Sequence, residues 1–205
     1  MKQLRIMSET ELSQLGTDRE YSDWHFDGVS LNGKDLQEIS FKNCSFVGTN
    51  FMGTKLNNAV FVGCNLSNAN VSGSNCFGTQ WVESKITGVN FSRANSLIGM
   101  SFDRCVLDYA DLRGVDLSKQ DLQGCSFIEA DLSLCNLTHT SFMNCHCEGM
   151  KFDGATCSST DFRGATLQGI ILGQTNLKGV ILSAHQVISL AEELGIIVIQ
   201  PDTAE

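Results

Sequence analysis

Large apolar residues recur every five positions along most of the chain. The series runs from Tyr21 to Phe91, slips by one residue, and then continues from Leu97 to Leu182. A helix repeats every 3.6 residues and a strand every two, so neither element alone explains this spacing. In the stretch ADLRGVDLSKQDLQGCSF, at 110–127, the recurring residues are Leu112, Leu117, Leu122 and Phe127.

Each large residue has regular companions. A small residue usually stands two positions before it, and a glycine often stands two positions after it, as Cys44 and Gly48 do around Phe46. The segments ADLRG at 110–114 and VNFSRA at 89–94 resemble the A(D/N)LxG motif of the pentapeptide-repeat family, and the resemblance extends over 21–182. It implies an all-β fold, a right-handed quadrilateral β-helix. Each pentapeptide would form one side, and four would form a coil of about twenty residues. Such a rod would have about eight coils stacked at strand spacing.

The columns of residues twenty apart support this arrangement. The column that begins with Tyr21, Phe41, Phe61 and Trp81 is nearly all aromatic, whereas the column that begins at Leu36 has no aromatic residue. Both columns stay in phase only if the slip is one inserted residue. We therefore predict an unbroken β-helix over 21–182 with a one-residue bulge at 96–100, which comprises Ser96, Leu97, Ile98, Gly99 and Met100.

Both ends of a solenoid need caps, because the terminal coils expose apolar faces and strand edges. Residues 1–20 are the predicted N-terminal cap, in which SETELSQLG offers a capping box of Ser8 with Glu11 and a short helix ended by Gly16. Residues 183–205 contain a stronger helix signal, with Ser183 as N-cap, Gln186 completing the box, and Gly195 at the end. The following IIVI, at 196–199, predicts a short strand.

The C-terminal helix and strand carry more apolar surface than a cap requires. This favours a homodimer interface, although capping of the chain's own last coil is the alternative. The predicted interface residues are Val187, Ile188, Leu190, Ala191, Leu194, Ile197 and Ile199.

The tail ISLAEELGIIVIQPD and the segment NCFGTQWVESKITGVNFSRA at 75–94 resemble the Qnr quinolone-resistance proteins, and the tail more loosely resembles that of mycobacterial MfpA. The resemblance implies that two rods join end to end, that the acidic dimer imitates duplex DNA, and that it binds DNA gyrase or topoisomerase IV. Qnr proteins typically carry two loops that leave the rod. This chain has only the predicted bulge, as in the loop-poor MfpA type, so loop contacts are not carried over.

The net charge of −9 lies mainly in the C-terminal half. Residues 21–96 carry five acids and five bases, 97–182 carry ten acids and six bases, and the tail carries four acids and no base. This distribution fits imitation of DNA and argues against direct binding to nucleic acid, although acids that only confer solubility are the alternative. Asp111 and Asp131, twenty apart, would stack on adjacent coils, with Asp108 near the same corner. The predicted topoisomerase contact comprises Asp108, Asp111, Asp116 and Asp131.

The sequence gives little support for a disulfide, a metal site or catalysis. The nine cysteines, with no export signal, are expected to be reduced and buried. In Cys145-His146-Cys147, alternation places the two sulfurs inside and the imidazole outside, which argues against a metal site. No catalytic, cofactor or membrane-span motif is present. We therefore expect a cytoplasmic, non-enzymatic protein without cofactor or metal that binds a topoisomerase. The alternative is a scaffold or adaptor that binds another protein through its flat faces.

Overall fold

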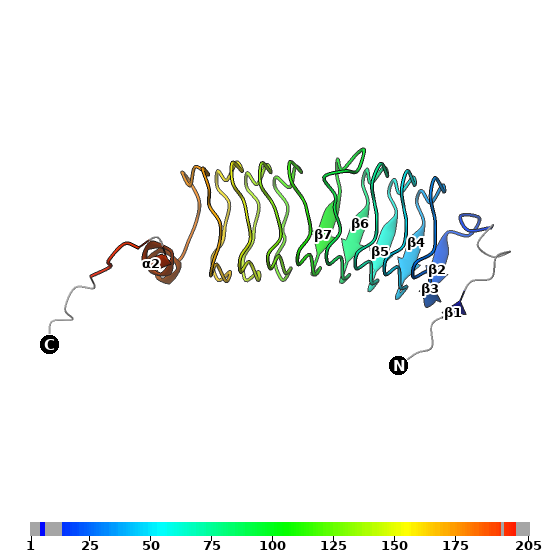
Figure 1. Ribbon diagram of the computed structural model, residues 1–205, viewed down its shortest axis with the longest axis horizontal. Coiled ribbons are helices and arrows are strands. Elements are labelled where there is room, and N and C mark those ends of the chain that lie inside the picture. Colours follow the sequence, from blue (N-terminus) through cyan, green and yellow to red (C-terminus); the bar gives the residue numbers. More distant parts are fainter. Residues whose placement is uncertain (1–4, 7–13, 194, 200–205) are drawn as a thin grey trace.

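The computed structural model describes residues 5–6, 14–193 and 195–199. The chain forms a mostly-β parallel solenoid, an elongated row of stacked turns with a helix at its C-terminal end (Figure 1). Five short strands on one side form a parallel sheet in the order β2-β4-β5-β6-β7, and a two-stranded sheet pairs β1 with β3. The strands are β1 (Arg5–Ile6), β2 (Glu20–Ser22), β3 (Trp24–His25), β4 (Ser40–Lys42), β5 (Val60–Val62), β6 (Gln80–Val82) and β7 (Ser101–Asp103).

Residues twenty apart lie side by side, as the repeat predicts. Phe41 pairs with Phe61, and Phe61 pairs with Trp81. Isolated parallel bridges continue the same register beyond the sheet, for example between Ser141 and Asp161. Bridge positions recur every five residues, so each twenty residues contribute four sides. We name the sides A, B, C and D after the bridge positions 121, 126, 131 and 136 and their equivalents in other coils.

The corners between sides explain the frequent glycines. At most corners, the amide of the residue three positions after the large apolar residue donates to that residue's carbonyl, as Thr49 N does to Phe46 O at 3.0 Å. Two residues lie between them, and the second, here Gly48, has a φ of 63°. A positive φ at this place is typical of a type II turn, which favours glycine or asparagine.

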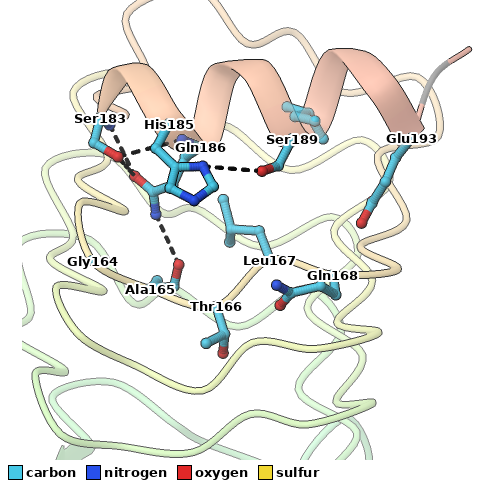
Figure 2. A pocket seen from close by; sticks show the side chains of 11 residues that line it. Gly164, Ala165, Thr166, Leu167, Gln168, Ser183, His185, Gln186, Ser189 and Glu193 are labelled. Atoms are coloured by element: carbon cyan, nitrogen blue, oxygen red, sulfur yellow. Dashed lines mark hydrogen bonds between the residues drawn. The ribbon is translucent and has the colours of Figure 1, made fainter.

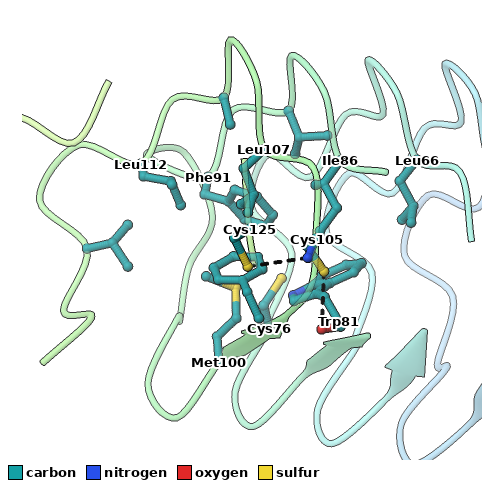
Figure 3. Close-up of a cluster of buried hydrophobic side chains, with 14 of the residues drawn as sticks. Leu66, Cys76, Trp81, Ile86, Phe91, Met100, Cys105, Leu107, Leu112 and Cys125 are labelled. Carbon is teal, nitrogen blue, oxygen red and sulfur yellow. Dashed lines mark hydrogen bonds between the residues drawn. The ribbon is translucent and has the colours of Figure 1, made fainter. Parts of the chain in front are cut away.

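The large and small inward residues fill a continuous core. The ring of Phe61 stacks between those of Phe41 and Trp81, with centroid distances of 5.0 and 4.5 Å. The small residues donate across the coils: the hydroxyl of Thr54 bonds the carbonyl of Leu31 at 2.8 Å. Figure 3 shows a thiol in the same role, because Cys105 Sγ donates to Trp81 O at 3.3 Å. A small inward residue therefore also satisfies backbone acceptors.

All nine cysteines are buried free thiols. Burial raises the pKa of Cys76 and Cys105 to about 11, and that of Cys125 and Cys135 to about 12. Because the thiolate is the reactive form, these four side chains are inert core residues at neutral pH.

The register changes from 20 to 21 residues near the predicted bulge. Phe61 pairs with Trp81, but Trp81 pairs with Phe102. The side between bridge residues Asn90 and Ser96 holds six residues, while the side 96–100 has the ordinary five-residue layout. The prediction that the bulge lies at 96–100 is therefore wrong. The corner that precedes β7 projects beyond its neighbours (Figure 1). The six-residue gap between Phe91 and Leu97 already places the extra residue before Leu97, in agreement with the bridges.

The two ends differ from the predictions in part. The N-terminal helix was predicted within 8–16, of which 8–13 lie outside the described residues, while 14–16 form a turn. The pairing of β1 with β3 was not predicted. At the other end, α2 (Ala184–Glu193) is present, but 196–199 form no strand. The predicted strand is wrong for this single chain, because an isolated extended segment has no neighbour to bond.

Candidate functional site

The residue before each large apolar residue has a structural task. Where it is Asp or Asn, its side chain accepts the amide two positions later, as Asp116 Oδ1 does from Ser118 N at 2.9 Å. Asn50 Oδ1 accepts Met52 N at 3.1 Å in the same way. Such turns need an oxygen acceptor and do not need a charge. These hydrogen bonds explain why a side chain with an oxygen acceptor precedes each leucine in 110–127.

Asp111 and Asp131 stack on side C, as predicted, but a base lies between them. Arg113 Nη2 contacts Asp111 Oδ2 at 2.6 Å, and Arg113 Nε lies 3.7 Å from Asp131 Oδ2. Hydrogen bonding to this guanidinium holds the pKa of Asp111 below its usual range. Arg113 therefore compensates part of the charge of this pair, and the pair is a weaker anionic surface than the sequence suggested.

Asp108 and Asp116 lie on different sides of the rod. Asp108, on side B, accepts hydrogen bonds from the Ser126 hydroxyl at 2.5 Å and the Ile128 amide at 3.1 Å. Asp116 is exposed on side D, opposite side B, and hydrogen bonds to Ser118 lower its pKa. The structure thus brings three of the four predicted contact residues to the corner between sides B and C, and leaves Asp116 apart.

Negative charge collects on two adjacent sides. Sides C and D are close to balanced, with three acids and four bases on C and three of each on D. Side A has six acids and three bases, and side B has four acids and one base. The members of the last two sets are Glu20, Asp23, Glu83, Asp103, Asp121 and Asp161 with Lys42, Arg104 and Arg163 on side A, and Asp27, Asp108, Glu129 and Glu148 with Lys85 on side B.

The bases of side A already have partners, whereas side B is almost free of bases. Lys42 contacts Glu20 at 3.0 Å, Arg104 contacts Glu83 at 2.9 Å, and Arg163 contacts Asp161 at 2.7 Å. Lys85 is the one lysine or arginine of side B, and it precedes the acids of the C-terminal half. The least compensated charge in the described chain therefore lies on side B after residue 105.

Two residues of this surface were missed by the sequence analysis. Glu129 is exposed and has no ion-pair partner among the described residues, and Glu148 has only His146, at 3.9 Å. Glu129 N donates to Glu148 O at 2.8 Å, so the two lie on adjacent coils. The sequence contains a signal for both residues. Glu129 lies twenty residues after Tyr109 and Glu148 lies forty after Asp108, so each shares a column with a residue of the predicted corner. We define the acidic edge as Asp108, Asp111, Glu129, Asp131 and Glu148.

The helix α2 caps the last coil through polar side chains (Figure 2). Gln186 Nε2 donates to Phe162 O at 2.6 Å and to Ala165 O at 2.8 Å, and Glu193 accepts the Gly169 amide at 3.2 Å. The predicted capping box is present, because Gln186 Oε1 accepts Ser183 N at 2.9 Å. These bonds satisfy backbone groups that would otherwise be free at the end of the solenoid.

The predicted dimer residues divide into two groups. Leu190 lines an apolar pocket with Leu167 and Leu182 of the rod, so it serves the intramolecular cap. In contrast, Val187 is 51% exposed and Ile197 is 87% exposed. The half-buried residues are Ile188 and Ala191, Ile199 is exposed, and Leu194 lies outside the described residues.

Among the described residues, no group of three or more His, Cys, Asp or Glu side chains is arranged to hold a metal ion. The described helices also include none with the length and apolar character needed to cross a membrane.

Known proteins support the assignment of the fold. A pentapeptide-repeat region model matches 34–112, and a pentapeptide-repeats model matches 101–138 and 140–179. Full-length QnrB1, a plasmid-mediated fluoroquinolone resistance protein, has a TM-score of 0.59 at 22% identity, covering 86% of this chain and 90% of its own. A trypsin-treated QnrB1 variant gives 0.56 at 25% identity, covering 89% and 94%.

HetL, a pentapeptide-repeat protein involved in heterocyst differentiation regulation from the cyanobacterium Nostoc sp. strain PCC 7120, gives a TM-score of 0.49 at 21% identity. The alignment covers 80% of this chain and 72% of HetL. A sequence search of curated proteins finds no match. The repeat models span most of the solenoid, and the QnrB1 structures share its architecture. The chain therefore belongs to the pentapeptide-repeat family.

Proposed function

We propose that the protein is a non-catalytic DNA mimic that binds a type II topoisomerase, DNA gyrase or topoisomerase IV, and protects it from quinolones or peptide toxins. The main support is the position of the charge. The rod resembles QnrB1, a fluoroquinolone resistance protein, and its uncompensated acids collect along side B instead of spreading evenly. A basic DNA-binding groove would attract such a surface. A topoisomerase partner would place the protein in the cytoplasm.

The proposed active form is a right-handed, four-sided rod of about eight coils that pairs with a second copy through its C-terminal end. Exposed Val187, Ile197 and Ile199 are the apolar surface that pairing would bury. The four acids beyond residue 182 would then gather near the two-fold axis.

Sedimentation tests the dimer. Val187→Asp with Ile197→Asp changes two side chains that are exposed in the single chain, so the fold should survive. We expect a dimer for the wild type and a monomer for the double variant. A wild type that sediments as a monomer at micromolar concentration would remove the dimer from the proposal.

Supercoiling by purified gyrase and decatenation by purified topoisomerase IV, with and without a fluoroquinolone, test the function. We expect the protein to change either activity or to reduce drug-stabilised cleavage complexes. A charge-reversed acidic edge, Glu129→Lys with Glu148→Lys, should lose this effect, while Lys119→Glu on side D should keep it. If micromolar wild-type protein changes neither readout, the proposal is wrong.

The scaffold alternative has one observation in its favour. Phe77 and Ile98 are 44% and 72% exposed and lie on adjacent coils of side D, because Gly78 N donates to Ile98 O at 2.9 Å. An apolar pair on a nearly neutral side suits a partner other than a basic groove. Loss of partner binding in Ile98→Ser but not in Glu129→Lys would favour this alternative.

A further inference from the structure

Tyr109 occupies a backbone conformation that bulky side chains rarely adopt. Its φ is 60°, in a corner column that has Gly88 on the preceding coil, Glu129 with a φ of 53° on the next coil, and Gly149 on the coil after that. Outside glycine, and to a lesser degree asparagine and aspartate, this region is uncommon and costs energy. The fold would accept glycine at 109 with less strain, so turn geometry does not explain the tyrosine.

The tyrosine ring is also not part of the core. Its side chain is 57% exposed, and its hydroxyl makes no hydrogen bond to another described residue. Its amide donates to Ile128 O at 2.9 Å, which fixes the residue beside the next coil. An exposed aromatic in a strained turn, without an internal contact that requires it, indicates an external role.

The surroundings of Tyr109 define what it could contact. Asp108 precedes it, Glu129 follows it in the corner column, and Asp111 begins the next side. The exposed ring therefore projects from the acidic edge, at the least compensated part of the rod. A partner surface that complements it must be basic, and arginine both pairs with carboxylates and stacks on aromatic rings.

We propose that Tyr109 is the anchor of the contact between the acidic edge and a basic, arginine-bearing protein surface. This inference rests on the proposed function, since the occupant is the DNA-binding groove of the topoisomerase. Tyrosine and arginine are the residues in which binding energy concentrates at interfaces, and surrounding charges act mainly on specificity and association rate. The carboxylates orient the partner, and the ring supplies the desolvated contact.

Tyr109→Gly tests the anchor, because glycine fits the turn and the variant should fold at least as well as the wild type. We expect its affinity for purified gyrase or topoisomerase IV, measured by biolayer interferometry, to fall about tenfold or more. Tyr109→Phe keeps the ring and should keep most of the affinity. Leu134→Gly is the matched control, since Leu134 is also exposed, at 70%, with a φ of 62°, but lies on side C.

The outcomes separate the two proposals. If Tyr109→Gly binds as tightly as the wild type, or if Leu134→Gly weakens binding equally, the anchor is wrong and the acidic edge as a contact surface stands. If the wild type itself binds neither topoisomerase, both proposals fail. Thermal melting of each variant confirms that a loss of affinity does not reflect unfolding.

Discussion

The two halves of the rod use the same turn with different charge. In the N-terminal half, Asn50 Oδ1 accepts the amide two positions later at 3.1 Å, and in the C-terminal half Asp116 Oδ1 does so at 2.9 Å. At these positions the N-terminal half has one aspartate, Asp35, and asparagine at 50, 65, 70, 75 and 90. The C-terminal half has two asparagines, Asn136 and Asn176, and aspartate at 111, 116, 121, 131 and 161. Because asparagine suffices for the turn, the fold does not require the negative charge of the C-terminal half.

The halves also differ in their cores. In the N-terminal half, rings stack directly from coil to coil, with Tyr21 and Phe41 at 5.6 Å and Phe61 and Trp81 at 4.5 Å. In the same column of the C-terminal half, Leu122 interrupts the stack between Phe102 and Phe142, and one stacked pair remains, Phe142 and Phe162 at 4.9 Å. We infer that the N-terminal half is the more firmly packed end and that the C-terminal half is the end available for recognition.

The largest expected effect tests the packing difference. Phe61→Ala removes the middle ring of the stack and should lower the free energy of unfolding by about 3–5 kcal/mol. Leu122→Ala, in the same column of the other half, should cost about 2–5 kcal/mol and less than Phe61→Ala. Urea denaturation of both variants measures the difference. A larger loss for Leu122→Ala would reverse the assignment of the firmer half.

A smaller effect separates turn geometry from charge. Asp116→Ala removes the turn acceptor and should cost about 1 kcal/mol, whereas Asp116→Asn keeps it and should change stability by less than about 0.5 kcal/mol. Asn50→Ala is the matched variant of the other half and should cost as much as Asp116→Ala. Equal destabilisation by Asn and Ala at 116 would show that the charge itself stabilises the fold.

The smallest effect is a pH dependence, which we test at two carboxylates of the C-terminal half. Hydrogen bonding to Arg163 lowers the pKa of Asp161, and hydrogen bonding to Arg113 lowers that of Asp111. Because the folded pKa lies below the unfolded value, near 3.9, this stabilisation is present above that value and is lost as the pH falls through the folded pKa. The midpoint of urea denaturation should therefore fall less steeply below about pH 4 in Asp161→Asn than in the wild type. If the midpoints of the two proteins fall equally steeply with decreasing pH, the Arg163 contact contributes no stability.

The sequence was sufficient for features that repeat and insufficient for those that occur once. A five-residue period identifies Leu112 or Phe127 as inward residues, because every coil imposes the same burial. The extra residue between Asn90 and Ser96 occurs once, and the period bounds it only to the segment between Phe91 and Leu97. Arg113 pairs with Asp111, two positions before it, in a contact that depends on side-chain reach and not on the period.

The candidate site was predicted in part for the same reason. Following the bridge column by twenties places Asp111 beside Asp131, but Glu129 and Glu148 lie in other columns and become neighbours only when every column is followed. The strand at 196–199 was predicted only from its aliphatic composition. No described strand of the same chain pairs with this segment.

Binding of purified gyrase in competition with duplex DNA tests the central claim most directly. A labelled wild-type chain should bind the holoenzyme, should be displaced by linear DNA, and should bind more weakly as salt concentration rises. Glu129→Gln with Glu148→Gln should weaken binding, while Glu83→Gln on side A should have a smaller effect. If the wild type does not bind, or if DNA and protein bind together without competition, the DNA-mimic account is contradicted.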